Sequence, residues 1–420
     1  MSASSKSPLN RLSALLIRTL VWFGPVTRTR LGELTGFTRG QTNRLLEDLQ
    51  ARGWIVFGDE LRSPVGRPAV RVSLNPSLGC FLSVTLEDDT GKIALATSDL
   101  SIVAVKTFEY NFATGPTILL TALERQIRSL LAENQISPKK ILSMAVSVPG
   151  PVETREQSVF RPHPSPGWQG FDIAAYLDGA LRRPAFIDND ANTATVGELK
   201  YWRSHNLSAG GENWLVVKMN DSGIGAGIVS NGLVHRGATG LAGEIAHIQV
   251  ERNGPRCGCG LRGCLTSLAS APVLLERARL KMSTMATPPS DRSPGELSAQ
   301  TTFSLHDLGV AAQGGDEIAN SLLLEAGTRI GNVVAGVVST LNPAKVLVGG
   351  RFARMGPLIL SSIRQSIYGS SLPLSTHAID VEYLRNPDAE VTGTLVYAFE
   401  RLLDTQCQAN SFRAVLSPWG

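Results

Sequence analysis

The chain has little of several things that define whole classes of protein. Only five of its 420 residues are cysteine, and three of these fall between residues 257 and 264. An odd and clustered set does not suit the disulfide framework of a secreted domain. No apolar run is long enough to span a bilayer, and Arg18 interrupts the apolar stretch near the N-terminus, which no small-residue cleavage site follows. We therefore predict a cytoplasmic protein with no membrane insertion.

Charged residues are also few, at 18% of the chain, and they are unevenly distributed. Residues 1–75 carry eleven Lys and Arg against five Asp and Glu, a net charge of +6, which leaves −2 for the remainder. A basic segment on a slightly acidic body favours a polyanion partner for that segment alone. The length of the chain allows two or three domains with proper cores.

The basic segment has the pattern of a winged helix-turn-helix. Its apolar spacing predicts a helix over residues 9–22, then a short helix that ends at a tight turn at Gly36. Thr38 opens a longer helix, and Gln41 three residues later completes a capping-box pattern. Residues 54–75 alternate like a small β-hairpin, which would form the wing.

This arrangement predicts that residues 1–75 form a DNA-binding domain for a double-stranded operator. The second helix would enter the major groove with its N-terminal polar side chains toward the base edges, and the basic tip of the wing would suit a minor groove. Arginine can bind guanine or phosphate, and glutamine can read adenine. The expected DNA contacts are Thr38, Arg39, Gln41, Thr42, Arg44 and Arg67. The alternative is a three-helix unit that only packs or dimerises, and Arg18 and Arg52 are expected to be solvated or to face phosphate.

From residue 78 onward, expected strands and helices alternate with glycine-rich turns, which predicts an α/β body. Two strands are expected over residues 81–105, and a strand that runs into a helix over residues 184–202. Binding sites should lie at turns after strands. Residues 283–303 have the composition of a mobile insertion between helices.

Two short motifs of the body could carry chemistry. The stretch "DSGIGAG", residues 221–227, places three glycines in an expected hairpin turn, where backbone amides could approach a phosphate or a sugar. Turn geometry alone explains these glycines equally well. The stretch "DND", residues 188–190, ends an apolar strand, and Asp190 could orient and deprotonate a hydroxyl. Asp190 or Asn192 could instead simply cap the following helix.

The cysteine cluster "CGCGLRGC" predicts a metal site. Cys257, Cys259 and Cys264 supply three thiolates, and His247 is the nearest upstream candidate for a fourth ligand. Three cysteines and one histidine are a common set for structural zinc, and the glycines between them permit tight wrapping. Because C-x-C is tighter than the usual C-x₂-C, free buried thiols and a redox pair remain as alternatives to the favoured zinc.

Taken together, these motifs resemble the ROK family, which groups repressors and sugar kinases. Residues 243–265, "GEIAHIQVERNGPRCGCGLRGCL", are similar to the family pattern Gly-Glu-(Ile/Leu)-Gly-His followed by C-x-C-G-x-x-G-C. The stretches "SVPGPV", "FIDNDANTATVGE", "GIGAGIVSNGLVHRGATGLAGE" and "LNPAKVLVGG" match further family blocks in order. The resemblance covers about residues 78–405, and a winged helix in front of it is the layout of the family's repressor branch.

The resemblance implies a fold of the α/β class: an N-terminal winged helix-turn-helix followed by a two-lobed actin-like sugar-kinase body. It implies a small lobe of residues 78–198 plus about 386–405, and a large lobe of residues 199–385 that contains the zinc loop. It implies that a structural Zn²⁺ is bound by His247, Cys257, Cys259 and Cys264. It also implies that sugar hydroxyls are held by Asn189, Asp190, Glu244 and His247.

Two departures from the family pattern bear on activity. Family kinases carry an Asp-x-Gly-x-Thr phosphate loop after the first strand, whereas here Glu87 takes the place of that Asp, and Asp89 and Thr90 stand where small glycines are expected. Acidic side chains there would repel the phosphates of ATP. Thr266 also replaces a glutamate that contacts the sugar. Asp190, the presumed kinase base, is retained.

The sequence therefore predicts a sugar-responsive transcription factor, a repressor of carbohydrate uptake or catabolism genes, and not an enzyme. A sugar or sugar phosphate would shift the operator binding of a homodimer or homotetramer through its differential affinity for two arrangements. One alternative is an ATP-dependent sugar kinase, with or without a regulatory role, that uses Asp190 as its base. Another is a regulator that answers to a partner protein.

Overall fold

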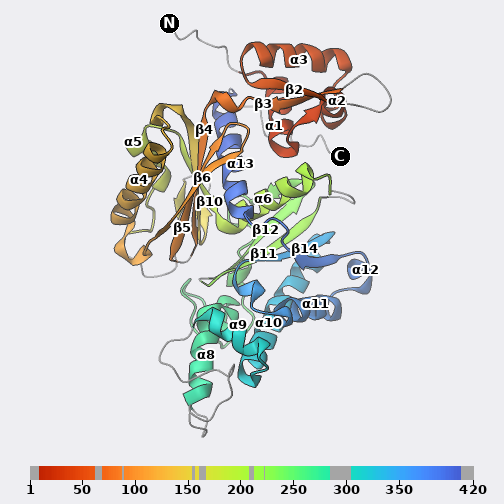
Figure 1. Ribbon diagram of the computed structural model, residues 1–420. Coiled ribbons are helices and arrows are strands. Elements are labelled where there is room, and N and C mark those ends of the chain that lie inside the picture. The colour runs from red at the N-terminus through yellow and green to blue at the C-terminus, as the bar shows by residue number, and fades with distance from the viewer. Residues whose placement is uncertain are drawn as a thin grey trace.

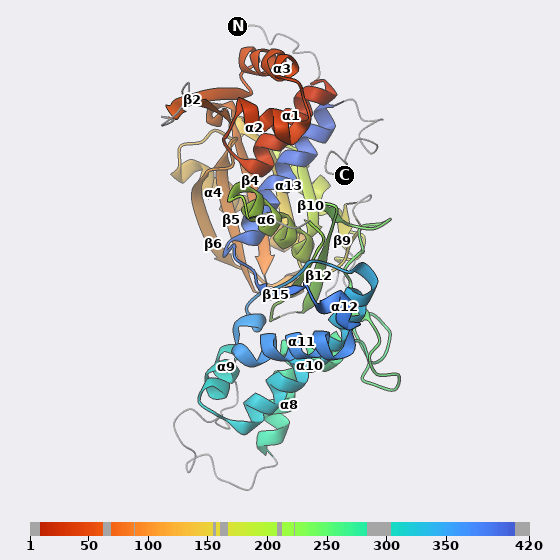
Figure 2. The same cartoon turned by 90° about the vertical axis from the view of Figure 1, so that its right-hand side faces the viewer.

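The computed structural model of the protein describes residues 9–61, 69–87, 89–153, 157–159, 167–207, 212–221, 223–283 and 304–407. Its parts follow one another along a single long axis (Figures 1 and 2). A small helical module lies at one end, two mixed sheets follow, and a group of helices lies at the other end. The described residues therefore form an N-terminal module on an α/β body.

The N-terminal module contains the three helices and the hairpin that the sequence predicts. The helices are α1 (Arg11–Phe23), α2 (Arg28–Thr35) and α3 (Arg39–Ala51), and the strands are β1 (Val26–Thr27), β2 (Ile55–Leu61) and β3 (Ala69–Leu74), in the order β1-β3-β2. Gly36 takes a left-handed φ of 72° between α2 and α3, where a side chain would be strained. The Thr38 hydroxyl accepts from the Gln41 amide, and the Gln41 side chain accepts from the Thr38 amide, so the predicted capping box is confirmed.

The first sheet of the body has the strand order β10-β7-β4-β5-β6. Its strands are β4 (Cys80–Glu87), β5 (Thr90–Thr97), β6 (Ile102–Glu109), β7 (Ile141–Val148) and β10 (Ala185–Asn189). Helices α4 (Pro116–Glu133) and α5 (Ile173–Leu181) cover one face, and α13 (Ala389–Gln406) covers the other (Figure 1). Alternate residues of β4 face these two layers, which explains why the strand is almost continuously buried.

The prediction of two strands over residues 81–105 is wrong, because the segment contributes to three. The third begins after a tight turn at residues 98–101, where Leu100 takes a φ of +67°. The Asp99 carboxylate organises this turn by accepting from the Thr97 hydroxyl at 2.6 Å and the Ser101 amide at 3.2 Å. No glycine or proline marks the turn, so the apolar pattern alone does not reveal it.

The second sheet repeats the plan of the first, with the order β13-β12-β11-β14-β15. Its strands are β11 (Trp214–Met219), β12 (Ile224–Ser230), β13 (Leu233–His235), β14 (Lys345–Gly349) and β15 (Asp380–Tyr383). In each sheet three consecutive strands form an antiparallel meander, and two later strands add in parallel beyond the first. The body is thus built from two copies of one topology.

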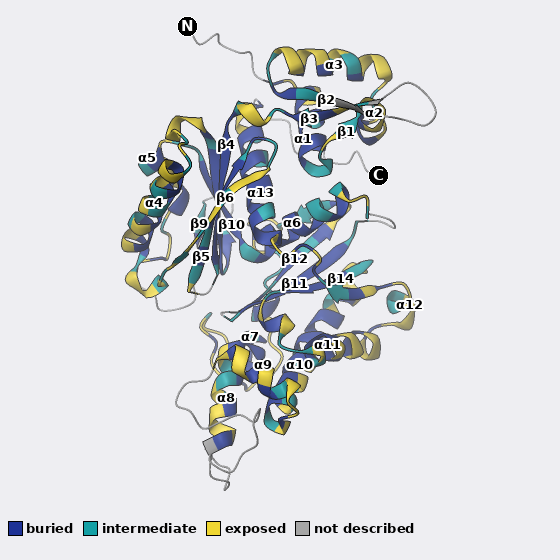
Figure 3. Cartoon of the chain, in the orientation of Figure 1, coloured by how far each residue is buried: buried dark blue, intermediate teal, exposed yellow. Residues whose placement is uncertain are grey.

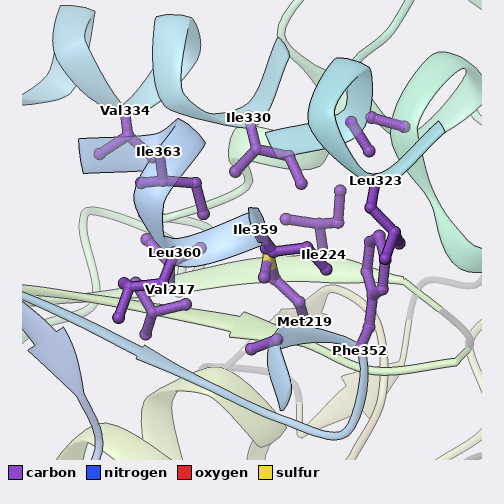
Figure 4. Packing of buried hydrophobic residues seen from close by; sticks show 14 of the residues in the cluster. Val217, Met219, Ile224, Leu323, Ile330, Val334, Phe352, Ile359, Leu360 and Ile363 are labelled. Atoms are coloured by element: carbon purple, nitrogen blue, oxygen red, sulfur yellow. The ribbon is translucent and has the colours of Figure 1, made fainter. Parts of the chain in front are cut away.

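Helices pack on the second sheet and enclose the largest apolar core. These helices are α7 (Thr266–Ala269), α8 (Ala271–Ser283), α9 (Leu305–Gln313), α10 (Glu317–Leu341) and α11 (Pro357–Ser370). Helix α12 (Pro373–Thr376) follows α11 and contributes no buried residue. The short strands β8 (Val152–Glu153) and β9 (Ser158–Val159) pair with each other elsewhere in the body. Among the helices of the described residues, α10 has the length and apolar composition that a membrane-spanning helix would need. Its Leu323, Ile330 and Val334 instead point into the core between α11 and the sheet (Figure 4). This burial indicates the central helix of a packed domain.

Helix α6 (Asp190–Ser204) lies between the two sheets and packs on α13 and β12. Glycines allow this close approach: a Cβ at Gly227 would lie 1.9 Å from the Thr195 hydroxyl oxygen, and one at Gly197 would lie 1.7 Å from the Ala389 carbonyl oxygen. Gly227 and Gly225 belong to strand β12, so the expectation that all three glycines of "DSGIGAG" occupy a hairpin turn is wrong. Position 227 requires glycine because α6 packs directly against β12 at this point.

The N-terminal module and the body share one hydrophobic core. Only residues 75–79 separate β3 from β4, and Leu20 of α1 belongs to the same buried cluster as Leu403 of α13. Arg18 lies within this contact, with its side chain only 8% exposed, and donates to Glu400 at 2.8 Å while also contacting Asp404. The expectation that Arg18 is solvated or faces phosphate is therefore wrong, since α13 supplies two carboxylates for it.

Candidate functional site

The outer face of α3 carries the exposed basic residues expected of a recognition helix. Arg39 and Arg44 are exposed, and Figure 3 shows this face turned away from the rest of the molecule. Thr38 and Gln41 are exposed as well, although their side chains also form the capping box. Four of the six predicted DNA contacts thus share one accessible helix end, and another, Arg67, lies outside the described residues.

The prediction that Thr42 contacts DNA is wrong. Its side chain is buried, at 2% exposure, and its hydroxyl donates to the Thr38 carbonyl at 3.1 Å. It faces α2, where the absence of a side chain at Gly32 leaves room for it. Thr42 therefore stabilises the contact between the two helices of the motif.

The predicted metal ligands come together in one cluster. The ligand atoms of His247, Cys257, Cys259 and Cys264 all lie within 4.8 Å of one another. The Cys257 sulfur is 3.6 Å from His247 Nδ1, and the Cys259 and Cys264 sulfurs are 3.7 Å apart, with no disulfide between them. Three thiols and an imidazole at this spacing match the donor set of a closed tetrahedral site, so these residues could hold a metal ion.

Glycines shape the loop that carries the cysteines. Gly260 and Gly263 have φ values of 94° and 66°, in the region that favours glycine. A Cβ at Gly263 would lie 1.6 Å from the Glu251 carbonyl oxygen, so only glycine fits there. The loop is closed further by the Cys257 amide, which donates to the Leu261 carbonyl at 2.8 Å. This backbone positions the sulfurs around one point.

The residues that the resemblance assigns to sugar binding lie at the start of α6 and in the loop before the cysteines. Asn189 ends β10 and caps α6: its Oδ1 accepts from the amides of Ala191 and Asn192, and its Nδ2 donates to Gly150. The helix cap is thus Asn189, and not Asp190 or Asn192 as the alternative reading proposed. Its side-chain amide is committed to the backbone.

Asp190 and Glu244 lie close enough to influence each other. Burial, together with the charge of Asp190, raises the pKa of Glu244 to about 7. Glu244 opens the short turn Ile245–His247, so the turn places Glu244 near Asp190 and places His247 at the metal cluster. Thr266 begins α7 two residues after Cys264, the last of the predicted metal ligands, and is half-buried. Carboxylates arranged in this way can accept hydrogen bonds from hydroxyl groups, and an imidazole can accept or donate one.

A buried ion cluster at Asp190 was missed by sequence reasoning. The Lys218 ammonium, on β11, is 2.9 Å from Asp190 Oδ2 and 3.5 Å from Glu87 Oε1, and it contacts Glu390 directly. Glu390 belongs to α13 and is itself buried. The only signal in the sequence is a charged residue within the apolar strand "WLVVKM". The departure at Glu87 noted from the family pattern thus lies beside the presumed base.

The fold and the site together define a class of protein. A model of the ROK family matches residues 84–403, which is most of the chain, so the protein belongs to the ROK family. The predicted family and the predicted α/β fold with a ROK body are confirmed, and the N-terminal helices and hairpin are consistent with the predicted winged helix-turn-helix.

Individual relatives divide into regulators and kinases. The chain is similar to a xylose repressor of Bacillus spizizenii, with 23% identity over 360 residues that span 86% of this chain and 87% of the repressor. It is 27% identical over 294 residues to a glucokinase of Halalkalibacterium halodurans, covering 70% of this chain and 86% of the glucokinase. It shares its fold, at a TM-score of 0.74 and 23% identity, with the crystal structure of a ROK family transcriptional regulator that is a homologue of the Escherichia coli MLC protein, over 94% of this chain and 98% of that one. The regulators match nearly the whole chain, whereas the glucokinase leaves a larger part unmatched.

Proposed function

We propose that the protein is a sugar-responsive DNA-binding regulator, a repressor of carbohydrate genes, and that it is not an enzyme. The observation that carries the proposal is the exposed basic end of α3 on a module that shares a hydrophobic core with a ROK body. A sugar or sugar phosphate bound by the body would then change operator binding. Such a protein works where the chromosome lies, in the cytoplasm of a bacterial cell.

In this proposal the metal is a structural Zn²⁺ that orders the sugar site. Because His247 Nδ1 faces Cys257 Sγ, metal binding at Nδ1 leaves Nε2 free to meet a sugar hydroxyl. This geometry supports both roles that the resemblance implies for His247, as a zinc ligand and as a sugar-binding residue. Asp190 and Glu244 would accept from other hydroxyls, and Asn189 would hold the start of α6 in place.

Helix α6 offers a physical route from the sugar site to the DNA-binding module. Asp190 begins the helix, and Arg203 in its last turn lies over the ring of Trp22 in α1, 4.8 Å from the ring centroid. Arg203 is held in place by Glu212 and by the Gly232 carbonyl at 2.7 Å. A ligand that displaces α6 would therefore displace α1, and a shift of α1 would change the position of the recognition helix.

The DNA-binding domain spans residues 1–75, the small lobe residues 78–198 plus about 386–405, and the large lobe residues 199–385. The protein acts as a homodimer or homotetramer, because helix-turn-helix proteins read two-fold related half-sites. A partner protein could act on the same equilibrium as the sugar. The expected insertion, residues 283–303, lies outside the described residues apart from Ser283, which ends α8.

The decisive experiment is a mobility-shift titration on DNA from upstream of the protein's own gene. Zinc-loaded protein is titrated with and without hexoses, pentoses, N-acetylated sugars and their phosphates. We expect a specific shift that one sugar class changes, because only that class fits the site. A zinc-loaded protein that produces no specific shift contradicts the proposal, and a specific shift that no sugar changes favours a partner protein as the effector.

Single substitutions test which side chains read the operator. Arg39→Ala and Arg44→Ala should each weaken specific binding by about 1–3 kcal/mol if they contact guanine, because a bidentate contact is lost. Arg125→Ala removes the same charge from the exposed face of α4 and is the matched control, expected to leave operator affinity unchanged. Equal affinities for all three variants would show that α3 is not the recognition helix.

A second candidate function is sugar phosphorylation, favoured by the position of Asp190 at the start of α6 and by the similarity to a glucokinase. In this alternative, Asp190 would take a proton from a sugar hydroxyl while ATP and Mg²⁺ occupied the site. Isothermal titration with Mg²⁺–ATP discriminates the two functions. We expect no measurable affinity, and binding with turnover would establish the kinase.

A further inference from the structure

Three carboxylates from three separate elements converge on one ammonium group. Glu87 ends β4, Asp190 begins α6, and Glu390 belongs to α13, whereas Lys218 comes from β11 of the other sheet. Lys218 Nζ lies 2.9 Å from Asp190 and 3.5 Å from Glu87, and it contacts Glu390.

The cluster is largely closed to solvent. The Lys218 side chain is 5% exposed and that of Glu390 is 8% exposed, against 16% for Asp190. A buried charge without partners is strongly destabilising, so these groups depend on one another. Burial alone disfavours the ammonium, but Asp190, Glu390 and Glu87 outweigh it and raise the pKa of Lys218. Lys218 is therefore a permanent cation.

Glu390 is the most deeply buried of the three carboxylates. Burial raises the pKa of Glu390 well above the usual value for a glutamate, and the neighbouring Glu87 acts in the same direction. Glu390 Oε1 accepts a hydrogen bond from the Ser147 hydroxyl at 2.6 Å, while Oε2 accepts from Lys218.

Carboxylate oxygens that converge from several elements are the usual surroundings of a divalent cation. Phosphoryl transfer from ATP needs such a cation to bridge the phosphates, and it needs a carboxylate free to receive the proton of the attacking hydroxyl. In this protein Lys218 Nζ occupies the centre of the carboxylates. Asp190 Oδ2 already accepts from Lys218, and Oδ1 accepts from the Ala191 amide at 3.0 Å.

We infer that Lys218 is a built-in cation that takes the place of a divalent metal ion and converts a phosphoryl-transfer position into a fixed ion cluster. The inference rests on the proposed function, because it explains how a sugar site can keep Asp190 and still release its ligand unmodified. Asp190 remains partly exposed and can accept from a sugar hydroxyl. With the Lys218 ammonium among the carboxylates, the divalent cation that phosphoryl transfer requires is displaced, so the hydroxyl is bound and not phosphorylated.

The test asks whether removal of the ammonium creates a divalent-cation site. Full-length, zinc-saturated wild type and Lys218→Ala are titrated with Mn²⁺, and bound Mn²⁺ is followed by electron paramagnetic resonance and by the melting temperature. We expect wild type to bind no Mn²⁺ at the cluster, and Lys218→Ala to bind one Mn²⁺ with a dissociation constant on the order of 1 mM or tighter. The bound ion should restore much of the melting temperature lost on substitution.

Two further variants control the test. Lys218→Arg keeps a cation in the cluster and should bind no Mn²⁺. The double variant Lys218→Ala with Asp190→Asn removes a ligand of the new site and should bind Mn²⁺ at least about tenfold more weakly than Lys218→Ala. If Lys218→Ala does not fold, Lys218→Ala with Glu390→Gln, which removes one carboxylate with the ammonium, is measured in the same way.

Equal Mn²⁺ affinity of wild type and the folded Lys218→Ala, or of the fallback double variant, overturns the inference. The readout is independent of DNA and sugar, so the two proposals fail separately. A Mn²⁺ site in Lys218→Ala with no operator binding by wild type would contradict the regulator. Sugar-dependent operator binding without the new Mn²⁺ site would contradict the role of Lys218 alone.

Discussion

At the scale of single residues, the metal ligands show how a local motif can specify a site. Cys257, Cys259 and Cys264 lie on one loop, and His247 precedes them by only ten residues, so short backbone hydrogen bonds and two glycines are enough to bring them together. Cys259 is the least buried of the three thiols. Its replacement therefore removes a ligand without leaving a cavity in the core.

We expect Cys259→Ser to lose its metal. Zinc per chain, measured by atomic emission after dialysis, should fall from one to well below one, with affinity lowered by a factor on the order of 100 or more. The melting temperature should fall with it. Cys80→Ala, a buried cysteine outside the cluster, should keep one zinc per chain. Full zinc content in Cys259→Ser would remove the assignment of that ligand.

At the scale of elements, the contact between α1 and α13 joins the DNA-binding module to the body. Arg18 is buried between them with Glu400 and Asp404, and the Trp22 indole donates to Glu400 at 2.9 Å. One end of α1 therefore touches the body while α1 also packs on α2 and α3. This element is where a change in the body would reach the recognition helix.

We expect Arg18→Met to destabilise the protein by about 2–4 kcal/mol, because it leaves Glu400 without its cation, although partial exposure of Asp404 lessens the cost. It should also reduce the effect of the sugar on operator binding while sugar affinity stays near that of wild type. Chemical denaturation, calorimetric titration and mobility shifts measure the three quantities. Arg128→Met, which removes an exposed ion pair on α4, is the control and should change stability by less than about 1 kcal/mol. An unchanged sugar response in Arg18→Met would exclude α1 as the connection.

At the scale of the whole molecule, the module and the first sheet are one packed unit. Asn75, between them, donates to the Gly53 carbonyl at 2.9 Å and accepts at its own carbonyl from the Ser98 hydroxyl at 2.6 Å. A connection that is hydrogen-bonded on both sides, above a shared core, leaves little freedom for independent movement. Movement of the module thus requires movement of the body.

We expect the helix-turn-helix and the first sheet to unfold in one transition. Hydrogen exchange under increasing denaturant should give the slowest amides of α3 and β4 the same free energy of opening, because neither can lose the shared core alone. Amides of α8, at the far end of the molecule, provide an internal comparison. A module that opens at clearly lower denaturant than β4 would show that it is joined to the body only by its linker.

Local sequence determined the helix-turn-helix, its capping box, the strand that leads into α6 and the cysteine loop. Each depends on residues only a few positions apart, where spacing and backbone preference suffice. Only the tertiary structure decided that Arg18 and Thr42 are buried, that the two sheets repeat one topology, and that Asp190 is held by Lys218. Glu400 is 382 residues from Arg18 and Glu390 is 172 residues from Lys218, and no local sequence pattern predicts contacts over such distances. Whether a charged residue such as Arg18 is solvated or buried depends on which distant helix packs against it, and this packing is set by the tertiary fold.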